Sequence, residues 1–193
     1  MKIAVYNYKG GVGKTRISLN LSLSLDFGVI TNDVYSPLER VLDPERLLKL
    51  DIGQPIPDLP NDADVIFDLG GYPDERAVRI LEISDFVLIP VMLDFGDLQV
   101  TLDFINEIQE FNNNIVVIAN KTTKGDFEQI EEVIHEFFPQ ISVLEIKQSR
   151  ALPNLFQERK SIRDMVNEGG MKKFHFTPIA EQFDAIIHHL NIG

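Results

Sequence analysis

The chain has 193 residues, a formal net charge of −12 and no cysteine. The length suits one domain with a well-buried core, and the lack of cysteine excludes disulfides, thiolate zinc sites, iron–sulfur ligation and cysteine nucleophiles. No apolar run reaches the roughly 18 residues that a membrane span needs. No signal-peptide pattern opens the chain. We therefore expect a cytoplasmic protein with a single domain over residues 1–193, without a helix-turn-helix domain before the first strand.

Short runs rich in β-branched residues alternate along the chain with longer segments of helical periodicity. Most of the short runs are apolar throughout, which is typical of strands covered on both faces. The alternation predicts an α/β fold, with a doubly wound, mostly parallel sheet, helices on both faces and right-handed crossovers. The predicted strands cover 2–7, 29–31, 64–68, 86–91, 115–119 and 141–146, and the predicted helices cover 14–26, 37–50, 74–83, 97–112, 126–138 and 178–190.

A glycine-rich turn, "GGVGKT" at 10–15, follows the first predicted strand and opens the first predicted helix. In a P-loop, the glycines let main-chain N–H groups converge on phosphate oxygens, and the helix N-terminus adds its positive end. Lys14 would neutralise the β- and γ-phosphates, and the hydroxyl of Thr15 would reach Mg²⁺. The sequence therefore predicts a P-loop NTPase. Its expected nucleotide-binding residues are Lys9, Gly10, Gly11, Val12, Gly13, Lys14, Thr15, Arg16 and Asn120.

The standard P-loop pattern has a glycine at position 8, where this chain has Tyr8 followed by Lys9. The resulting "KGGVGKT" resembles the deviant Walker A motif of the ParA/MinD ATPases, and "NYKGGVGKT" looks particularly like ParA partition proteins. The resemblance implies that Lys9 reaches across an ATP-sandwich homodimer to the partner's nucleotide, as an arginine finger does. The family usually has Thr or Ser after the position of Thr15, where this chain has Arg16. The role of Arg16 stays open.

Two strand ends carry candidate acidic groups. Asp68 ends the apolar run 64–68, and a carboxylate at that end of a parallel strand lies on the ligand side of the sheet. It looks like the Walker B aspartate, so Thr15 and Asp68 are the predicted Mg²⁺ ligands. Asp33 follows the second strand, where the family has a second acidic motif, and could orient water or the metal shell. Lys9, Lys14 and Asp33 are the predicted catalytic residues.

The strand over 115–119 runs into Asn120 and Lys121. Guanine-specific NTPases carry a carboxylate two residues after such a lysine, and this chain has Thr123 there. ATP is therefore favoured over GTP. In the ParA/MinD family an asparagine at this strand end contacts the base, and Asn120 matches it.

The stretch 147–173 is basic, with seven Lys or Arg against three acidic residues, in an otherwise acidic chain. Contacts to DNA phosphates need basic residues and no readout of the bases. We therefore predict a ParA-type ATPase whose ATP dimer binds nonspecific DNA at the nucleoid. Its slow hydrolysis, stimulated by a ParB-like or other partner, would drive DNA partition or cargo positioning. The candidate DNA-binding residues are Arg150, Arg159, Lys160, Arg163, Lys172 and Lys173; a solvated surface is the alternative interpretation of these charges.

A MinD-like membrane-associated positioning ATPase is the alternative function. Such a protein would carry a C-terminal amphipathic helix with a basic polar face. The segment 177–193 is amphipathic but carries Glu181 and Asp184 and no Lys or Arg. Membrane binding through that segment is therefore not expected.

Overall fold

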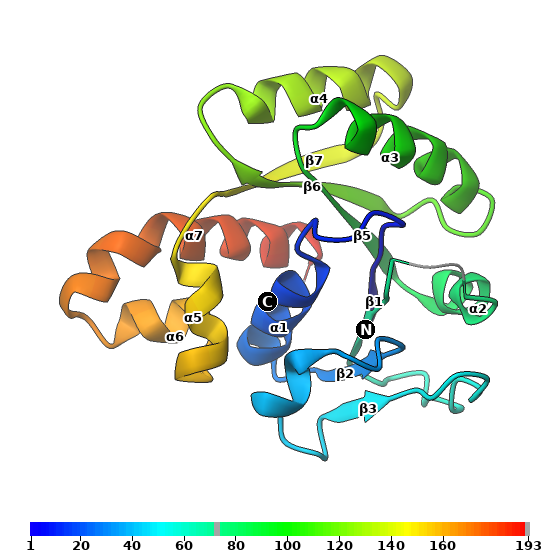
Figure 1. Cartoon of the computed structure of the whole chain (residues 1–193), viewed down its shortest axis with the longest axis horizontal. Helices are drawn as coiled ribbons and strands as arrows, with labels where there is room; N and C mark the ends of the chain where they lie inside the picture. The colour runs from blue at the N-terminus through cyan, green and yellow to red at the C-terminus, as the bar shows by residue number, and fades with distance from the viewer. Residues whose placement is uncertain (72–73, 192–193) are drawn as a thin grey trace.

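The computed structural model describes residues 1–71 and 74–191. Within them the chain forms a seven-stranded sheet in the order β3-β2-β4-β1-β5-β6-β7, and every neighbouring pair of strands is parallel (Figure 1). This confirms the predicted α/β class. The strands are β1 Lys2–Val5, β2 Gly28–Thr31, β3 Leu47–Lys49, β4 Val65–Asp68, β5 Phe86–Val91, β6 Ile115–Thr122 and β7 Ser142–Lys147.

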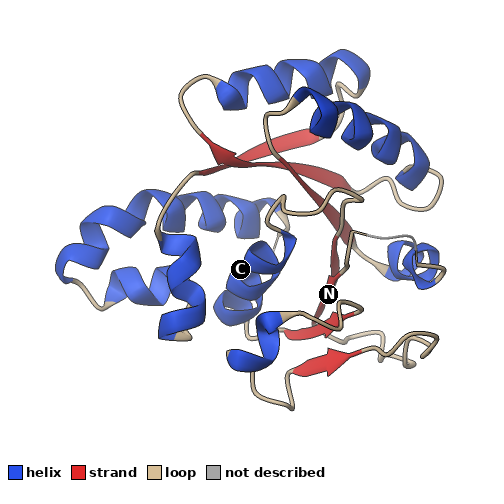
Figure 2. Ribbon diagram, viewed as in Figure 1, coloured by secondary structure: helices blue, strands red, loops and turns tan. Residues whose placement is uncertain are grey.

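Helices cover both faces of the sheet (Figure 2). On one face lie α2 (Arg76–Ile83), α3 (Phe95–Ile108) and α4 (Asp126–Phe137). The other face carries α1 (Lys14–Leu25), α5 (Ala151–Glu158), α6 (Ile162–Asn167) and α7 (Gly170–His189), together with the short 3₁₀ helix η1 (Pro37–Arg40). The sheet is therefore the middle of three layers.

The two faces of each strand pack into separate cores. In β5, Val87 and Ile89 pack with α2, α3 and α4, whereas Leu88 between them packs with the helices of the other face. Successive side chains of a strand point to opposite sides. A strand covered on both sides must therefore be apolar at every position, which is the pattern that the sequence shows.

The predicted helix over 37–50 is wrong. The chain forms only η1 there and then the edge strand β3, which pairs with β2. Pro44 explains the break, because it has no N–H to donate and disfavours a helical conformation at Asp43 before it.

The C-terminal third is more helical than the sequence analysis predicts. No helix is expected within 147–173, yet α5 and α6 form there, and α7 begins at Gly170 rather than at 178. Because proline is common in the first turn of a helix, the sequence predicts a helix that begins at Pro178. The true start lies at Gly170, and Pro178 is inside α7. None of the helices in the described part of the chain combines the length and apolar character that crossing a membrane requires.

The order of the strands indicates where on the sheet a ligand would bind. The connection from β1 leads to β2 on one side of β4, whereas β5 returns to the opposite side of β1. In open parallel sheets, ligands bind beyond the carboxyl ends of the strands where the order reverses in this way. The glycine-rich turn at 10–15 follows β1 at this point.

One prediction concerns α7, which packs by a single face. Phe183 is 2% exposed and Phe174 on the same helix is 80% exposed. Phe183→Ala should lower the free energy of unfolding by about 3–5 kcal/mol, because it removes a buried ring and leaves a cavity. Phe174→Ala should change it by less than about 0.5 kcal/mol. Urea denaturation of both variants checks this, and similar losses in the two would contradict the placement of α7.

Candidate nucleotide-binding site

The loop between β1 and α1 is shaped by two glycines with positive φ. Gly11 has φ 80° and Gly13 has φ 99°, values in the left-handed region that favours glycine. Gly13 is also pressed against β6, because a Cβ there would lie 2.2 Å from Nδ2 of Asn120. Only glycine fits at position 13, and the helix N-terminus that follows at Lys14 opens onto the loop.

Lys14 is 8% exposed and spans the inside of the loop. Its Nζ donates to the main-chain carbonyl oxygens of Asn7 and Lys9, at 3.0 and 2.9 Å. Burial lowers the pKa of Lys14, while the carboxylates of Asp68 and Asp33 oppose that shift. A cation held in this way is positioned to bind an anion that enters the loop.

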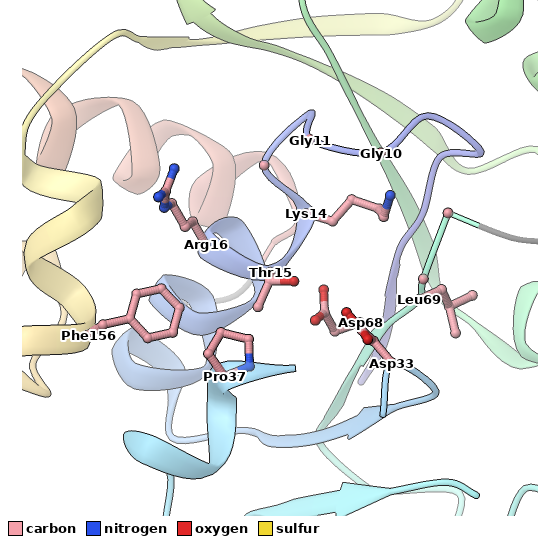
Figure 3. Close-up of a pocket in the computed structure, with 13 residues that line it drawn as sticks. Gly10, Gly11, Lys14, Thr15, Arg16, Asp33, Pro37, Asp68, Leu69 and Phe156 are labelled. Carbon is pink, nitrogen blue, oxygen red and sulfur yellow. The ribbon is translucent and has the colours of Figure 1, made fainter. Parts of the chain in front are cut away.

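Asp68, at the end of β4, lies beneath the same loop and is 2% exposed. Its Oδ1 accepts from the hydroxyl of Ser18 at 2.8 Å, and the Thr15 hydroxyl bonds to it as well. Burial raises the pKa of Asp68 to about 6, against these hydrogen bonds and the charge of Lys14. Figure 3 shows the side chains of Thr15, Asp68 and Asp33 facing one another. The structure therefore brings the predicted Mg²⁺ ligands together with two of the three predicted catalytic residues, Lys14 and Asp33. Lys9, the third, is exposed and does not line the cleft that they form.

Asp33 sits in a turn after β2. Its main-chain N–H donates to Oγ1 of Thr31 at 3.1 Å, and its Oδ1 accepts from the N–H of Tyr35 at 3.0 Å. These bonds fix the carboxylate at the edge of the cleft. Its neighbour Asn32 is buried and accepts from the N–H of Gly70 at 2.7 Å, so the ends of β2 and β4 are joined.

The cleft that these residues line has a volume of about 360 Å³. Figure 3 shows Pro37 of η1 and Phe156 of α5 on the side away from Lys14, with Arg16 directed away from Asp68. The lining residues are Gly10, Gly11, Gly13, Lys14, Thr15, Arg16, Asp33, Pro37, Asp68, Leu69, Gly70, Gly71 and Phe156.

Asn120 lies under the loop rather than in the lining of the cleft. Its Nδ2 donates to the carbonyl oxygen of Val12 at 2.6 Å, and its Oδ1 is buried without a hydrogen-bond partner among the described residues. Lys121 beside it donates to the carbonyl oxygen of Gly11 at 2.9 Å. Burial and the nearby charge of Arg16 lower the pKa of Lys121. The end of β6 thus supports two residues of the loop.

Sequence reasoning missed three supporting residues. Asn7, which is fully buried, donates to the carbonyl oxygen of Pro90 at 2.9 Å and accepts from the N–H of Lys9. Lys121 and Asn32 act through partners far away in the sequence. In the sequence these residues are marked only by their position at strand ends. That position does not show which distant residue each side chain will bond.

The residues at this edge suit Mg²⁺. No group of three or more His, Cys, Asp or Glu side chains able to hold a metal occurs within residues 1–71 and 74–191. Mg²⁺ is commonly bound by one or two protein groups, with waters and substrate phosphates completing its shell. One buried carboxylate beside one hydroxyl, as at Asp68 and Thr15, fits that mode of binding.

The fold is shared with known ATPases. No protein-family model and no curated protein matches the sequence. An ATP complex of McdA from Cyanothece superposes with a TM-score of 0.70 at 15% identity, covering 100% of this chain and 96% of that one. MinD from Pyrococcus horikoshii with Mg-ADP gives 0.65 at 15%, covering 98% of each. A ParA family ATPase from Chlorobium tepidum gives 0.63 at 16%, covering 91% and 96%.

The chain has the fold of the ParA/MinD ATPases. In this ParA/MinD-like fold the basic stretch 147–173 falls on β7, α5, α6 and the start of α7. Lys160 pairs with Glu168, Arg163 with Asp184, and Lys172 with both Glu158 and Glu168. Three of the six predicted DNA-binding residues are therefore in ion pairs. The other three are Arg150, Arg159 and Lys173, which are exposed and without an ion-pair partner in the described part of the chain.

A prediction follows from the packing of the loop. Gly13→Ala should lower the free energy of unfolding of the nucleotide-free protein by about 1–3 kcal/mol, because it combines backbone strain with a clash on Asn120. Gly10→Ala is the control, since a Cβ there meets no atom within 4 Å. It should change the free energy by less than about 0.5 kcal/mol. Chemical denaturation checks both, and equal stability of the two variants would refute the packing.

A second prediction concerns Asp68, whose pKa is raised from 3.8 to about 6. A carboxyl whose pKa is raised in the folded state destabilises the fold once it ionises. The free energy of unfolding therefore falls between about pH 4 and pH 6 and stays lower at higher pH. Asp68→Asn should therefore raise the free energy of unfolding by about 1–3 kcal/mol at pH 7.5 and leave it nearly unchanged at pH 4.

Urea denaturation at both pH values measures this effect in the nucleotide-free protein. Asp62→Asn, at an exposed position, is the control and should show no such difference. A gain that is independent of pH, or a loss at pH 7.5, would show that burial does not perturb Asp68 in this way.

Proposed function

We propose that the chain is a Mg²⁺-dependent ATPase of the ParA/MinD type, and that its ATP-bound form is a homodimer that binds nonspecific DNA. The observation that carries the proposal is the convergence of Lys14, Thr15 and Asp68 on one cleft beneath a loop that begins with Lys9. A stimulating partner protein, ParB-like or other, completes the cycle of slow hydrolysis and release. The fold shared with McdA, MinD and ParA structures supports this assignment.

The residues of the cleft divide the chemistry between them. Lys14, whose Nζ bonds the carbonyl oxygens of Asn7 and Lys9, would bind the β- and γ-phosphates. Thr15 and Asp68 would hold Mg²⁺, which supplies charge neutralisation on the phosphates when bound. Asp33, held at the edge of the cleft, orients the attacking water. With Asp33 as the one carboxylate of that turn, hydrolysis is slow, as suits a switch.

Two features support ATP as the nucleotide. The Oδ1 of Asn120, unpartnered among the described residues, is an acceptor that suits the exocyclic amino group of adenine, and Thr123 stands where guanine-specific NTPases carry a carboxylate. Because this oxygen is buried, the loop over Asn120 must shift before a base reaches it. Gly10, Gly11, Val12 and Gly13 provide the main-chain N–H groups for the phosphates, and Arg16 with Lys121 adds positive charge beside them.

Dimerisation has support at the same edge of the sheet. Lys9 is exposed at the tip of the loop. Tyr35, in the turn after β2, is 90% exposed, and Ile52, after β3, is 91% exposed. Large apolar side chains at this edge of the sheet lose their contact with water when a second copy covers them. Such a homodimer brings Lys9 of one copy to the nucleotide of the other.

DNA binding is proposed through the cations that are not engaged in ion pairs. Arg150 lines a groove with Met171 and Lys172, and Lys172 is paired with Glu158, the neighbour of Arg159. Arg150 therefore lies by the first turn of α7, which also carries Lys173, and Arg159 directly follows a residue that is paired with that turn. Contacts from such side chains to phosphates are independent of sequence and weaken with salt.

A MinD-like membrane function is the second candidate, and one observation favours it. Met171 is 76% exposed and Phe174 is 80% exposed, next to Lys172 and Lys173. Apolar side chains between lysines suit an anionic membrane surface. The start of α7 therefore offers a membrane-binding feature that the segment 177–193 lacks.

The test is binding to nonspecific duplex DNA and to anionic vesicles with ATP-Mg²⁺, with ADP-Mg²⁺ and without nucleotide, alongside light scattering for the mass of the particle. We expect a dimer only with ATP-Mg²⁺, and DNA binding only by that dimer. Lys14→Ala should lose nucleotide binding, and Lys9→Ala should lose the dimer, because the trans contact to phosphate is gone. Joint replacement of Arg150 and Arg159 by Ala should reduce the salt slope of DNA binding by about 2.

Lys124→Ala, at an exposed position outside the cleft, is the control and should behave as the unmodified chain. Dimers that bind vesicles and not DNA would replace the DNA function with the membrane function. A particle that stays monomeric with ATP-Mg²⁺ would refute the switch altogether.

A further inference from the structure

A second cavity, with a volume of about 430 Å³, lies between α2 and α3 on the face of the sheet opposite α1. We name it the acidic–aromatic cavity. It has no lining residue in common with the nucleotide cleft. Its wall carries the rings of Tyr6, Tyr8, Phe104 and Phe111 and the carboxylates of Asp74, Glu75 and Glu107.

The charged side chains that line this cavity are acidic. None of the described residues that line it is a Lys, Arg or His. Asp74 is neutralised by Arg76 at 2.7 Å. Glu107 accepts from the uncharged hydroxyl of Tyr8, at 2.7 Å, and neither Glu107 nor Glu75 has an ion pair within the described chain. Two carboxylates at the mouth therefore lack a counter-ion among the described residues, and a cation entering the cavity would be attracted by both.

The rings of the aromatic wall pack against one another. Tyr6 meets Tyr8 and Phe104 edge to face, with ring centroids 5.6 and 5.0 Å apart, and Tyr8 meets Phe104 at 4.4 Å. Burial and Glu107 raise the pKa of Tyr8 to about 12, so its ring stays neutral. The faces of such rings attract guanidinium and ammonium groups. Val78, 39% exposed on α2, adds an apolar contact.

We propose that the acidic–aromatic cavity is the docking site for an arginine-bearing basic segment of a partner protein. Arginine suits it better than lysine, because a planar guanidinium stacks on rings while it bonds carboxylates. The cavity exceeds the volume of one such side chain, and Val78 would contact an apolar neighbour in the segment. The proposal deepens the proposed function, since it names the kind of partner that acts on the ATPase.

The walls of the cavity are linked to the nucleotide site on two sides. Glu107 holds Tyr8, the residue directly before Lys9. Asp74 accepts from Asn32 at 2.7 Å, and Asn32 in turn accepts from the N–H of Gly70, which lines the nucleotide cleft. A partner seated here would therefore contact both the start of the phosphate loop and the segment after β4.

The test uses acetyl-Leu-Arg-Leu-amide as the probe, titrated at low salt into the nucleotide-free, ¹⁵N-labelled protein. The control probe has citrulline in place of arginine and so keeps the shape and loses the charge. We expect amide shifts centred on Tyr8, Val78 and Glu107 with the arginine peptide and about tenfold weaker binding of the citrulline peptide. Joint replacement Glu75→Gln and Glu107→Gln should weaken binding of the arginine peptide by about tenfold as well.

Glu110→Gln is the matched control, because Glu110 is exposed near Glu107 and does not line the cavity. It should leave binding unchanged. Equal binding of the two peptides, an equal effect of Glu110→Gln, or shifts centred elsewhere would overturn the proposal. The measurement needs no nucleotide, so a chain that binds the peptide but forms no ATP dimer would refute the proposed function and leave this docking site standing.

Discussion

The structure depends on the burial of two opposite charges, Lys14 and Asp68, at the carboxyl edge of one sheet. They are 8% and 2% exposed, and each is satisfied mainly by uncharged groups: Lys14 by carbonyl oxygens, and Asp68 by hydroxyls. Charges buried in this way are costly to desolvate. The raised pKa of Asp68 and the lowered pKa of Lys14 show that cost. An anion beside Lys14 and a cation beside Asp68 would reduce this cost, which is what the proposed binding of phosphate and Mg²⁺ supplies.

The rest of the edge holds these two charges in place. Gly13 lies against Asn120, Lys121 holds the carbonyl oxygen of Gly11, and Gly71 lies so near the loop that a Cβ would be 2.7 Å from the carbonyl oxygen of Tyr8. The contacts come from β6 and from the segment after β4, which flank the loop on either side. Movement of either segment therefore changes the position of the loop, and a nucleotide that orders the loop orders both.

The sequence predicts those parts of this arrangement that are local. The order of strand, glycine turn and helix is contiguous, so Lys14, Thr15 and the helix start at position 14 are found directly, and Asp68 is found because a buried strand ends there. Distant pairs leave no such signal: nothing near Asn120 shows that it supports Val12, and nothing near Lys160 shows that it pairs with Glu168. The two prolines explain two wrong helix boundaries. Pro44 ends a helical pattern over 37–50, whereas Pro178 lies inside α7.

Tyr8 joins the two faces of the sheet. At this position the standard P-loop has glycine, whereas here a ring turns away from the nucleotide cleft and packs on Phe104 of α3. Its hydroxyl bonds to Glu107, so the start of the loop is anchored on the side opposite α1. A glycine would leave that side of the loop without an anchor. Tyr8 therefore matters for the role that we propose for Lys9 in a homodimer. Lys9 extends from a backbone that is fixed on both sides, and a side chain that reaches a second copy loses less conformational freedom when its backbone is already ordered.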